Sequence, residues 1–448
     1  MTGAKETQSK YLKDLRQEFD GLARTGPEWL REIRESAMRR FLELDFPTTR
    51  QEDWKYTNVS AIANGGFRLA TGGEGTEFDI EAARQLLPGG GDAVRLVFVD
   101  GHFSKALSSE NPPGGAKAGS IGALIGCVDG SVEAHLGRSA DCSNHAFTAL
   151  NTAFVTDGAF IEIANGAVID VPIYIVYVST GTRAAESVSH PRSLIIAGHH
   201  SQGTIVEQYI GLGSGRYFTN AVTEIVVGDG AVIGYTKLQQ ESAAALHVGS
   251  LYVRQGRDSS FSSNSTAIGG DLVRNDITII LDGEGADCEL NGLYIERDAQ
   301  HVDNHTLIDH ARPHGSSREN YKGILAGRST GVFNGSIVVR KDAQKTDAKQ
   351  SNKNLLLSPD AEINTKPQLE ILADDVKCSH GATIGHIDQE AIFYMRSRGI
   401  DEAAARSLMM YAFCNEILER IKPAEVREVL TREVFNRVTG GRWMSEVI

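Results

Sequence analysis

A cysteine and a histidine that could do chemistry together lie two positions apart, at Cys378 and His380. On a β-strand, residues i and i+2 point to the same face, so this spacing would place a thiol beside an imidazole. The imidazole could lower the pKa of the thiol, or the two groups could hold a soft metal together. Two ligands do not complete such a site, because a zinc ion or an iron–sulfur cluster generally takes about four. We therefore expect other residues, or another subunit, to complete any site built on this pair.

A second candidate is the histidine-rich stretch between residues 301 and 314. His301, Asp303 and His305 alternate, so a strand would turn all three to one face, which suits zinc or iron. His310 and His314 follow. A ladder of polar side chains along a β-coil explains the same composition without a metal, and spacing alone does not fix a tetrahedral geometry. The sequence favours the ladder and leaves metal binding here open.

Motifs for nucleotide binding and for hydrolysis are defective or missing. Residues 323 to 330, GILAGRST, imitate a phosphate loop, but the glycines are one residue too close and Arg328 replaces the required lysine. We find no His-Glu-x-x-His and no Gly-x-Ser-x-Gly elbow on a strand-to-helix turn. We expect no catalytic residues, and any ATP would have to be bound by a partner.

Composition divides the 448 residues into three zones. The chain carries a net charge of −13, with 47 Gly, only 11 Pro and 41% hydrophobic residues, which excludes disorder and collagen. Residues 1–60 and 389–448 are each neutral and hold three glycines apiece, so the whole net charge and 41 glycines fall in the middle. This acidic middle also argues against nucleic-acid binding, which needs a basic surface.

The two ends follow a helical period. Apolar residues recur at helical spacing from residue 5 to 44, with a break at Gly26 and Pro27, and again from 400 to 438, with Asp401 as an N-cap and a break at Pro423. We expect the two C-terminal helices to pack on the neighbouring β domain. A docking surface for another protein is the alternative.

The middle of the chain is typical of a β-coil. Short β-branched runs separated by Gly, Asn or Asp extend from about residue 147 to 387. Four runs open with Gly166, Gly203, Gly230 and Gly270, at irregular spacings of 37, 27 and 40 residues. A parallel β-helix tolerates such variation, whereas its rival, a β-sandwich, would need more hairpin turns.

These patterns predict four regions. They are a helical region (1–60), a mixed segment with one clear strand at 94–99 (61–146), the β-helix core (147–388) and a C-terminal helical domain (389–448). Within the first region, residues 47–58, PTTRQEDWKYTN, form a linker that Trp54 and Tyr56 would pin.

Several observations indicate a cytoplasmic protein. The N-terminus lacks the apolar core of a secretory signal, and the most apolar run is too short to span a membrane. The cysteines are odd in number, widely spread and free of any Cys-x-x-Cys, so we expect reduced thiols at Cys127, Cys142, Cys288, Cys378 and Cys414.

Long motifs resemble the SufB/SufD family of iron–sulfur cluster assembly proteins, and within it the SufD type. They are AQKTDAKQSNKNLLLS, KPQLEILADDVKCSHGATIG and IFYMRSRGI, together with PTTRQEDWKYTN and VDNHTLIDHARPHGSS, spanning residues 47 to 400. The resemblance implies a mainly β fold, a right-handed parallel β-helix flanked by N-terminal and C-terminal α-helical regions. It also implies a non-enzymatic scaffold subunit of the SUF system without a tightly bound cofactor.

The resemblance further implies partners. The end of the β-helix would pair with SufB, or with a second copy of the chain, and the C-terminal helices would dock the ATPase SufC, which binds the ATP. Cys378 and His380 would contribute to a transient iron–sulfur cluster at the shared interface. A SufB-type scaffold is the nearest alternative, but the strand that carries the SufB cysteine reads LEIL here, at residues 369–372.

Two rivals come from other classes. A β-helix polysaccharide lyase or hydrolase would line a groove with charged residues, here Arg340, Lys341, Asp342, Lys345 and Asp347, although such a charge run is usually a solvated edge. A purely structural module would use Cys378 only as a small buried hydrophobe.

Overall fold

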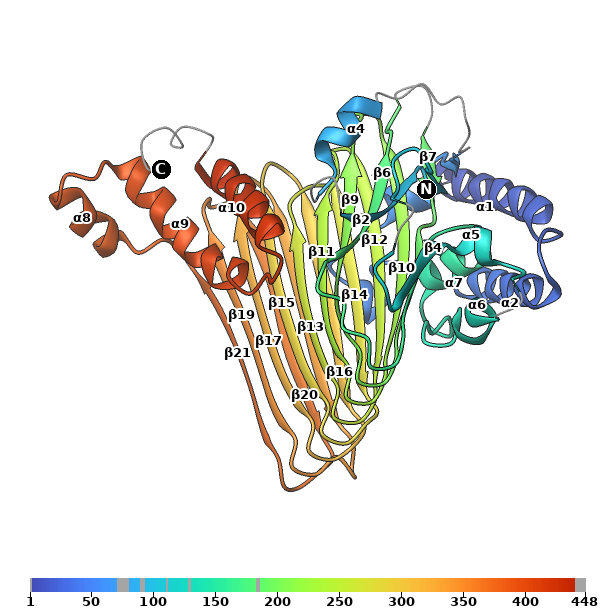
Figure 1. Ribbon diagram of the computed structural model, residues 1–448. Helices are drawn as coiled ribbons and strands as arrows, with labels where there is room; N and C mark the ends of the chain where they lie inside the picture. The colour runs from blue at the N-terminus through green and yellow to red at the C-terminus, as the bar shows by residue number, and fades with distance from the viewer. Residues whose placement is uncertain are drawn as a thin grey trace.

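A computed structural model describes residues 2–70, 80–88, 93–109, 112–127, 130–182 and 186–439. It shows a long solenoid of β-strands with helices at both flanks (Figure 1). The parallel β-helix architecture predicted from the sequence is confirmed. Among the described helices, none combines the length and the apolar character needed to cross a membrane.

The solenoid has two sheets, which we call sheet A and sheet B. Sheet A has eleven strands. They are β1 (Arg68–Leu69), β4 (Ala116–Ser120), β5 (Ala159–Ile163), β7 (Ser187–Ser189), β8 (Arg192–Ala197), β10 (Tyr217–Val227), β12 (Ala245–Gln255), β14 (Leu272–Leu281), β16 (His301–His310), β18 (Thr330–Val339) and β20 (Glu362–Ile371).

Sheet B has ten strands, and the main path of the chain alternates between the two sheets. Its strands are β2 (Val94–Val99), β3 (His102–Phe103), β6 (Ile173–Ser179), β9 (Gln202–Gly211), β11 (Val232–Gln240), β13 (Ser260–Ala267), β15 (Asp287–Glu296), β17 (Ser316–Leu325), β19 (Asp347–Leu356) and β21 (Lys377–Gly385). Neighbouring strands pair in parallel, except for the antiparallel pairs β2–β3 and β4–β5.

The helices lie mainly before and after the solenoid strands, as predicted. They are α1 (Thr2–Leu22), α2 (Glu28–Leu44), the 3₁₀ turn η1 (Glu52–Trp54), α3 (Ser60–Ala63), α4 (Ile80–Leu86), α5 (Ile121–Leu124), α6 (Ser131–His135), α7 (Ala146–Ala153), α8 (Gln389–Ser397), α9 (Glu402–Leu418) and α10 (Ala424–Thr439). The predicted break at Gly26 and Pro27 separates α1 from α2. The predicted Asp401 cap accepts a hydrogen bond from the Ala404 N–H.

The strand register reveals a repeat that the glycine spacing did not. Leu272 pairs with His301 and His301 pairs with Thr330, a step of 29 residues, while other rungs step by as few as 26 residues (Leu246 to Leu272) or as many as 32 (Thr330 to Glu362). Gly230 lies in register with His200 and with Asp258, and all three adopt positive φ at one corner of the solenoid. Because Asn, Asp and His also tolerate this conformation, the corner is not always glycine, and the irregular spacing of glycines concealed the rung.

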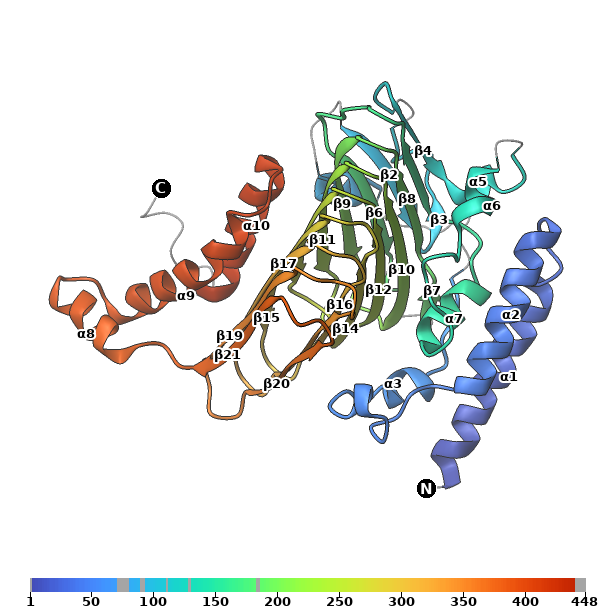
Figure 2. The same ribbon diagram turned by 90° about the horizontal axis from the view of Figure 1, so that it is seen from below.

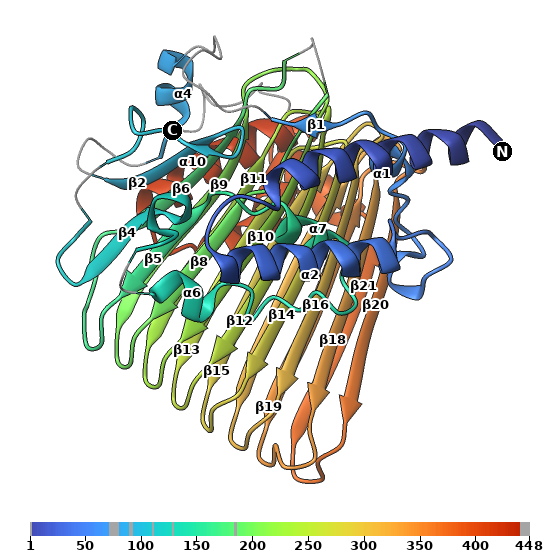
Figure 3. The same ribbon diagram turned by 90° about the vertical axis from the view of Figure 1, so that its right-hand side faces the viewer.

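The three largest apolar clusters of the described residues form layers between and outside the sheets. The largest core lies between the two sheets and is lined by aliphatic and aromatic side chains of both. A second layer joins the outer face of sheet B to α4, α9 and α10, and a third joins the outer face of sheet A to α1, α2 and α7. Figure 3 shows α1 and α2 lying across the sheet A side. The apolar stripes of α9 and α10 thus serve intramolecular packing, as expected for helices beside a β domain.

Candidate functional site

The site predicted at Cys378 and His380 lies on β21, the last strand of sheet B. Cys378 pairs with Ala348, which belongs to the core between the sheets, so the side chains of Cys378 and His380 both face the interior at its open end. Cys378 is half-buried and packs against that core, whereas His380 is exposed. The shared face expected from the i, i+2 spacing is therefore present.

The environment of Cys378 keeps its thiol protonated in the isolated chain. Burial raises the pKa of Cys378 and the Asp347 carboxylate adds to the rise, while a backbone hydrogen bond from Ala348 opposes it. A thiol becomes a metal ligand only as the thiolate, so metal binding here would have to release its proton. Within the described residues, no group of three or more His, Cys, Asp or Glu side chains could hold a metal ion. Cys378 and His380 alone are too few ligands for a metal site.

Both sheets end in an open edge at this site. Figure 2 shows β20 and β21 at the end of the solenoid. The Lys377 N–H donates to the Thr346 carbonyl at 2.8 Å, so alternation turns the backbone polar groups of Cys378, His380 and Ala382 toward the open edge. On β20 the residues whose backbone polar groups face the open edge include Pro367, which has no N–H to donate. Within the described part of the chain, no further strand covers either edge.

The histidine-rich stretch helps to hold the segment of residues 53–57 against sheet A, through an arrangement that we call the clamp. His301, Asp303 and His305 do share the outer face of β16, but Asp303 accepts hydrogen bonds from the Arg274 guanidinium at 2.5 Å and from Thr57. Burial acts to raise the pKa of Asp303, but Arg274 and His305 outweigh it and hold that pKa well below its usual range. The carboxylate is already neutralised by a cation, which leaves it a poor ligand for a metal ion.

The remaining histidines of this stretch point elsewhere. His310 is buried inside the solenoid, where a ring nitrogen lies 2.9 Å from the Ser317 hydroxyl, and burial lowers its pKa to about 4. His314 lies at a corner with positive φ and is exposed. The five residues do not converge, and the polar ladder favoured by the sequence describes them better than a metal site does.

The clamp explains the linker of residues 47–58. Trp54 stacks on Arg274, with the guanidinium carbon 4.2 Å from the ring centroid, and Arg274 also donates to the Asp53 carbonyl at 2.8 Å. Trp54 thus pins the segment to sheet A, as predicted. Tyr56 is exposed and does not contribute to the apolar layer.

The features behind the rival functions have structural roles. Three residues of the charge run form ion pairs between neighbouring rungs, Arg340 with Asp309, Lys345 with Asp375 and Asp347 with Arg318. Residues 323–330 run from β17 through a corner into β18, and no helix follows to receive a phosphate. These observations indicate that the charge run is a solvated edge of the solenoid and that residues 323–330 form an ordinary turn.

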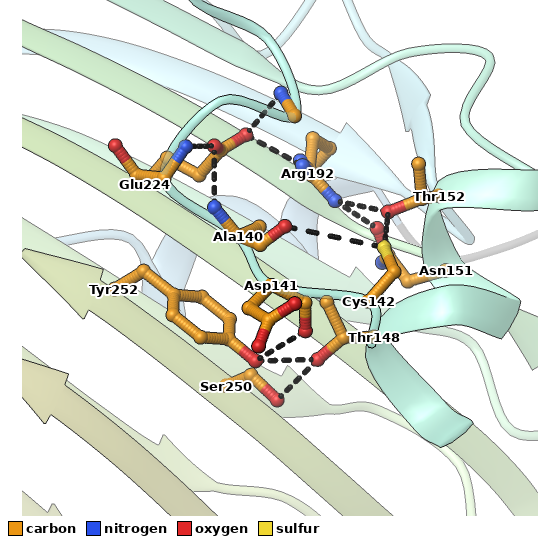
Figure 4. A network of polar contacts seen from close by, with 12 residues as sticks. Ala140, Asp141, Cys142, Thr148, Asn151, Thr152, Arg192, Glu224, Ser250 and Tyr252 are labelled. Atoms are coloured by element: carbon orange, nitrogen blue, oxygen red, sulfur yellow. Dashed lines mark hydrogen bonds and ion pairs between the residues drawn. The ribbon is translucent and has the colours of Figure 1, made fainter. Parts of the chain in front are cut away.

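A buried network was missed by the sequence reasoning (Figure 4). Arg192 and Glu224 form an ion pair at 2.5 Å with both side chains fully buried. Glu224 also accepts hydrogen bonds from the backbone N–H groups of Gly137, Ser139 and Ala140, at 2.8 to 2.9 Å. Arg192 is the only charged residue of β8, and Glu224 is the only charged residue of β10. A single charge in a strand rich in apolar residues is the signal that could have revealed the pair.

Comparisons with known proteins agree with this architecture. Residues 178–413 match the family model described as "SUF system FeS cluster assembly, SufBD core domain", and residues 5–175 match the "SufBD protein N-terminal region". The chain belongs to the SufBD family. This SufBD protein is 31% identical to the iron-sulfur cluster assembly protein SufD of Escherichia coli, over 90% of this chain and 92% of that protein. It is 33% identical to a SufBD family protein of Synechocystis, over 86% of each chain, and 31% identical to the chloroplastic protein ABCI7 of Arabidopsis thaliana, over 89% of this chain and 84% of that protein. Its assignment as a SufD-type iron–sulfur cluster assembly protein follows from these matches.

Proposed function

We propose that this chain is a non-catalytic scaffold subunit that pairs with SufB through the open end of its solenoid. The observation that carries the proposal is the terminal rung, where two uncovered sheet edges coincide with Cys378 and His380. Long exposed edges invite pairing with another chain, and natural proteins rarely leave them uncovered. A cytosolic location fits five cysteines that are all free thiols.

In this proposal, Cys378 and His380 supply part of a transient site for a nascent iron–sulfur cluster, which is cargo and not a resident cofactor. The partner supplies the other ligands, because two groups do not hold a cluster. The raised pKa of Cys378 lowers the fraction of thiolate until iron or a cationic group of the partner stabilises it. Assembly would thereby be confined to the paired complex.

The first test replaces the two side chains in the complex. We expect Cys378→Ser and His380→Ala each to lower the rate of cluster formation in the reconstituted complex about tenfold, because each removes one ligand. Cys127→Ser is the matched control, since that thiol is exposed and lies far along the chain. A wild-type rate in both variants, with the complex intact by gel filtration, would refute the role.

Thiol labelling separates the proposal from the purely structural alternative. We expect alkylation of Cys378 in the isolated chain and protection of the same thiol once the partner is bound. Equal labelling in both states would show that the partner covers another surface. A homodimer that protects Cys378 at the same edge would identify a second copy as the partner.

We also propose that the ATPase SufC docks on the C-terminal helices, with α8 as the anchor. The apolar stripes of α9 and α10 are covered by the solenoid and by each other, whereas Phe393 and Tyr394 of α8 are 74% and 59% exposed. Aromatic side chains that become buried when a partner binds are frequent hot spots of interfaces. ATP would be bound by that partner.

We expect the double substitution Phe393→Ala and Tyr394→Ala to weaken association with SufC more than tenfold, measured by calorimetry. Val168→Ala is the control, because that side chain is 55% exposed but lies on a distant part of the solenoid. Unchanged affinity would place the ATPase elsewhere.

A further inference from the structure

A groove on the outer face of sheet B is unrelated to the site at the open end. It has a volume of about 400 Å³ and lies between α4 and α10, over the carboxyl ends of β9 and β11. Both helices lie near the upper ends of the strands in Figure 1. The volume falls within the range of about 300–1,000 Å³ that is typical of binding sites.

The walls of the groove are apolar and partly open to solvent. Ile210, Leu238 and Val426 form a buried base, while Leu86 and Val429 are 48% and 54% exposed. Large aliphatic side chains exposed on facing helices offer a surface that a second apolar group would cover.

The polar side of the groove offers acceptors. Gln208 donates its amide N–H to the Gln240 carbonyl oxygen at 2.6 Å, and Gln240 donates in turn to the Glu433 carboxylate. The Gln208 side-chain oxygen is left without a hydrogen-bond partner, although the residue is only 7% exposed. A buried acceptor without a partner is unfavourable, so a side-chain adjustment that lets a ligand donate to it would be favoured.

The charge of the groove has one sign. Glu425 and Glu433 line it, and no Lys or Arg is among the described residues of its wall. Burial raises the pKa of Glu433, and the Gln240 amide and the Arg437 guanidinium only partly oppose this rise, so a further cation would still favour its charged form. Apolar walls, two carboxylates and a free carbonyl oxygen suit a cation carried on an aliphatic stem.

We propose that this groove receives a basic segment of a partner protein, in which a lysine or arginine side chain is flanked by aliphatic residues. The guanidinium or ammonium group lies between Glu425 and Glu433, beside the Gln208 side chain. The aliphatic neighbours cover Leu86 and Val429. This proposal does not rest on the role of Cys378.

Selection from a displayed library of random nonapeptides tests the chemistry directly. We expect the full chain to enrich peptides in which Lys or Arg is flanked by Leu, Ile or Val. Affinity of an enriched peptide should fall at least fivefold in Glu425→Gln and at least tenfold in the Glu425→Gln and Glu433→Gln double variant. Glu425 is exposed, and within the described part of the chain it makes no hydrogen bond or ion pair, so the single variant stays folded.

Glu428→Gln is the matched control, because it removes the same charge from the same helix outside the groove, and we expect less than a twofold effect. An equal loss in the control, enrichment of acidic or uncharged peptides, or no enrichment would overturn the proposal. Self-association that Glu425→Gln abolishes would identify a second copy.

Discussion

Replacing Glu224 with alanine is expected to lower the free energy of unfolding by about 3–5 kcal/mol. The carboxylate has four hydrogen-bonding partners, Arg192 and the three backbone N–H groups of residues 137, 139 and 140. Its removal leaves a fully buried guanidinium without its counter-charge, and the amide donors without acceptors. Arg192 keeps its bonds to Asn151 and Thr152, which do not carry charge.

The measurement is urea unfolding of the isolated chain, compared with Glu43→Ala. Glu43 also pairs with an arginine, at 2.7 Å, but its side chain is 64% exposed, so we expect a change below about 1 kcal/mol. The double variant Arg192→Met with Glu224→Leu removes the buried charge but leaves the three N–H donors unpaired. It should therefore recover only part of the loss. A Glu224→Ala variant as stable as the control would contradict this account.

The network also shows where sequence reasoning stops. Helices, strands and the shared face of Cys378 and His380 follow from periods of a few residues, which a single chain displays directly. The pairing of Glu224 with the loop at 137–140 joins residues more than 80 positions apart, and no local pattern encodes it. The same holds for Thr57 and Asp303, which are 246 positions apart. The hydrogen bond between them makes Asp303, a possible metal ligand, part of the clamp.

The rung length was hidden for a different reason. A corner needs a residue that tolerates positive φ, and glycine is only the commonest choice. His200, Asp258, His314 and Lys345 occupy such positions here. Once the register is known, the rungs of about 26 to 32 residues are evident, because inward-facing residues of successive rungs stack in columns. Glu319, Gln350 and His380 form one such column, which leads from the interior to the open end.

Two buried groups of the solenoid, one of them Glu319 in that column, should change the free energy of unfolding with pH in opposite directions. Burial lowers the pKa of His310 to about 4 and raises the pKa of Glu319 to about 7. The unfolded chain binds a proton at His310 below about pH 6.5 and the folded chain does not, so this histidine lowers stability as the pH falls from 6.5 toward 4. At Glu319 the folded chain binds the proton first, so stability is present at low pH and is lost as the pH rises through 7.

Each group changes the free energy of unfolding by about 2 kcal/mol between pH 7 and pH 5, and in the wild-type chain the two contributions oppose each other. Substitution separates them. Relative to wild type, His310→Gln should gain about 2 kcal/mol on going from pH 7 to pH 5, and Glu319→Gln should lose about as much. Urea unfolding at pH 7, 6 and 5 measures both slopes, with the exposed His314→Gln as the control for the histidine. Parallel slopes in all variants would mean that neither group is protonated differently in the folded and unfolded chains. Opposite slopes would show that the column beneath His380 holds a carboxyl group that stays protonated up to about pH 7, because the interior of the solenoid does not solvate its charge.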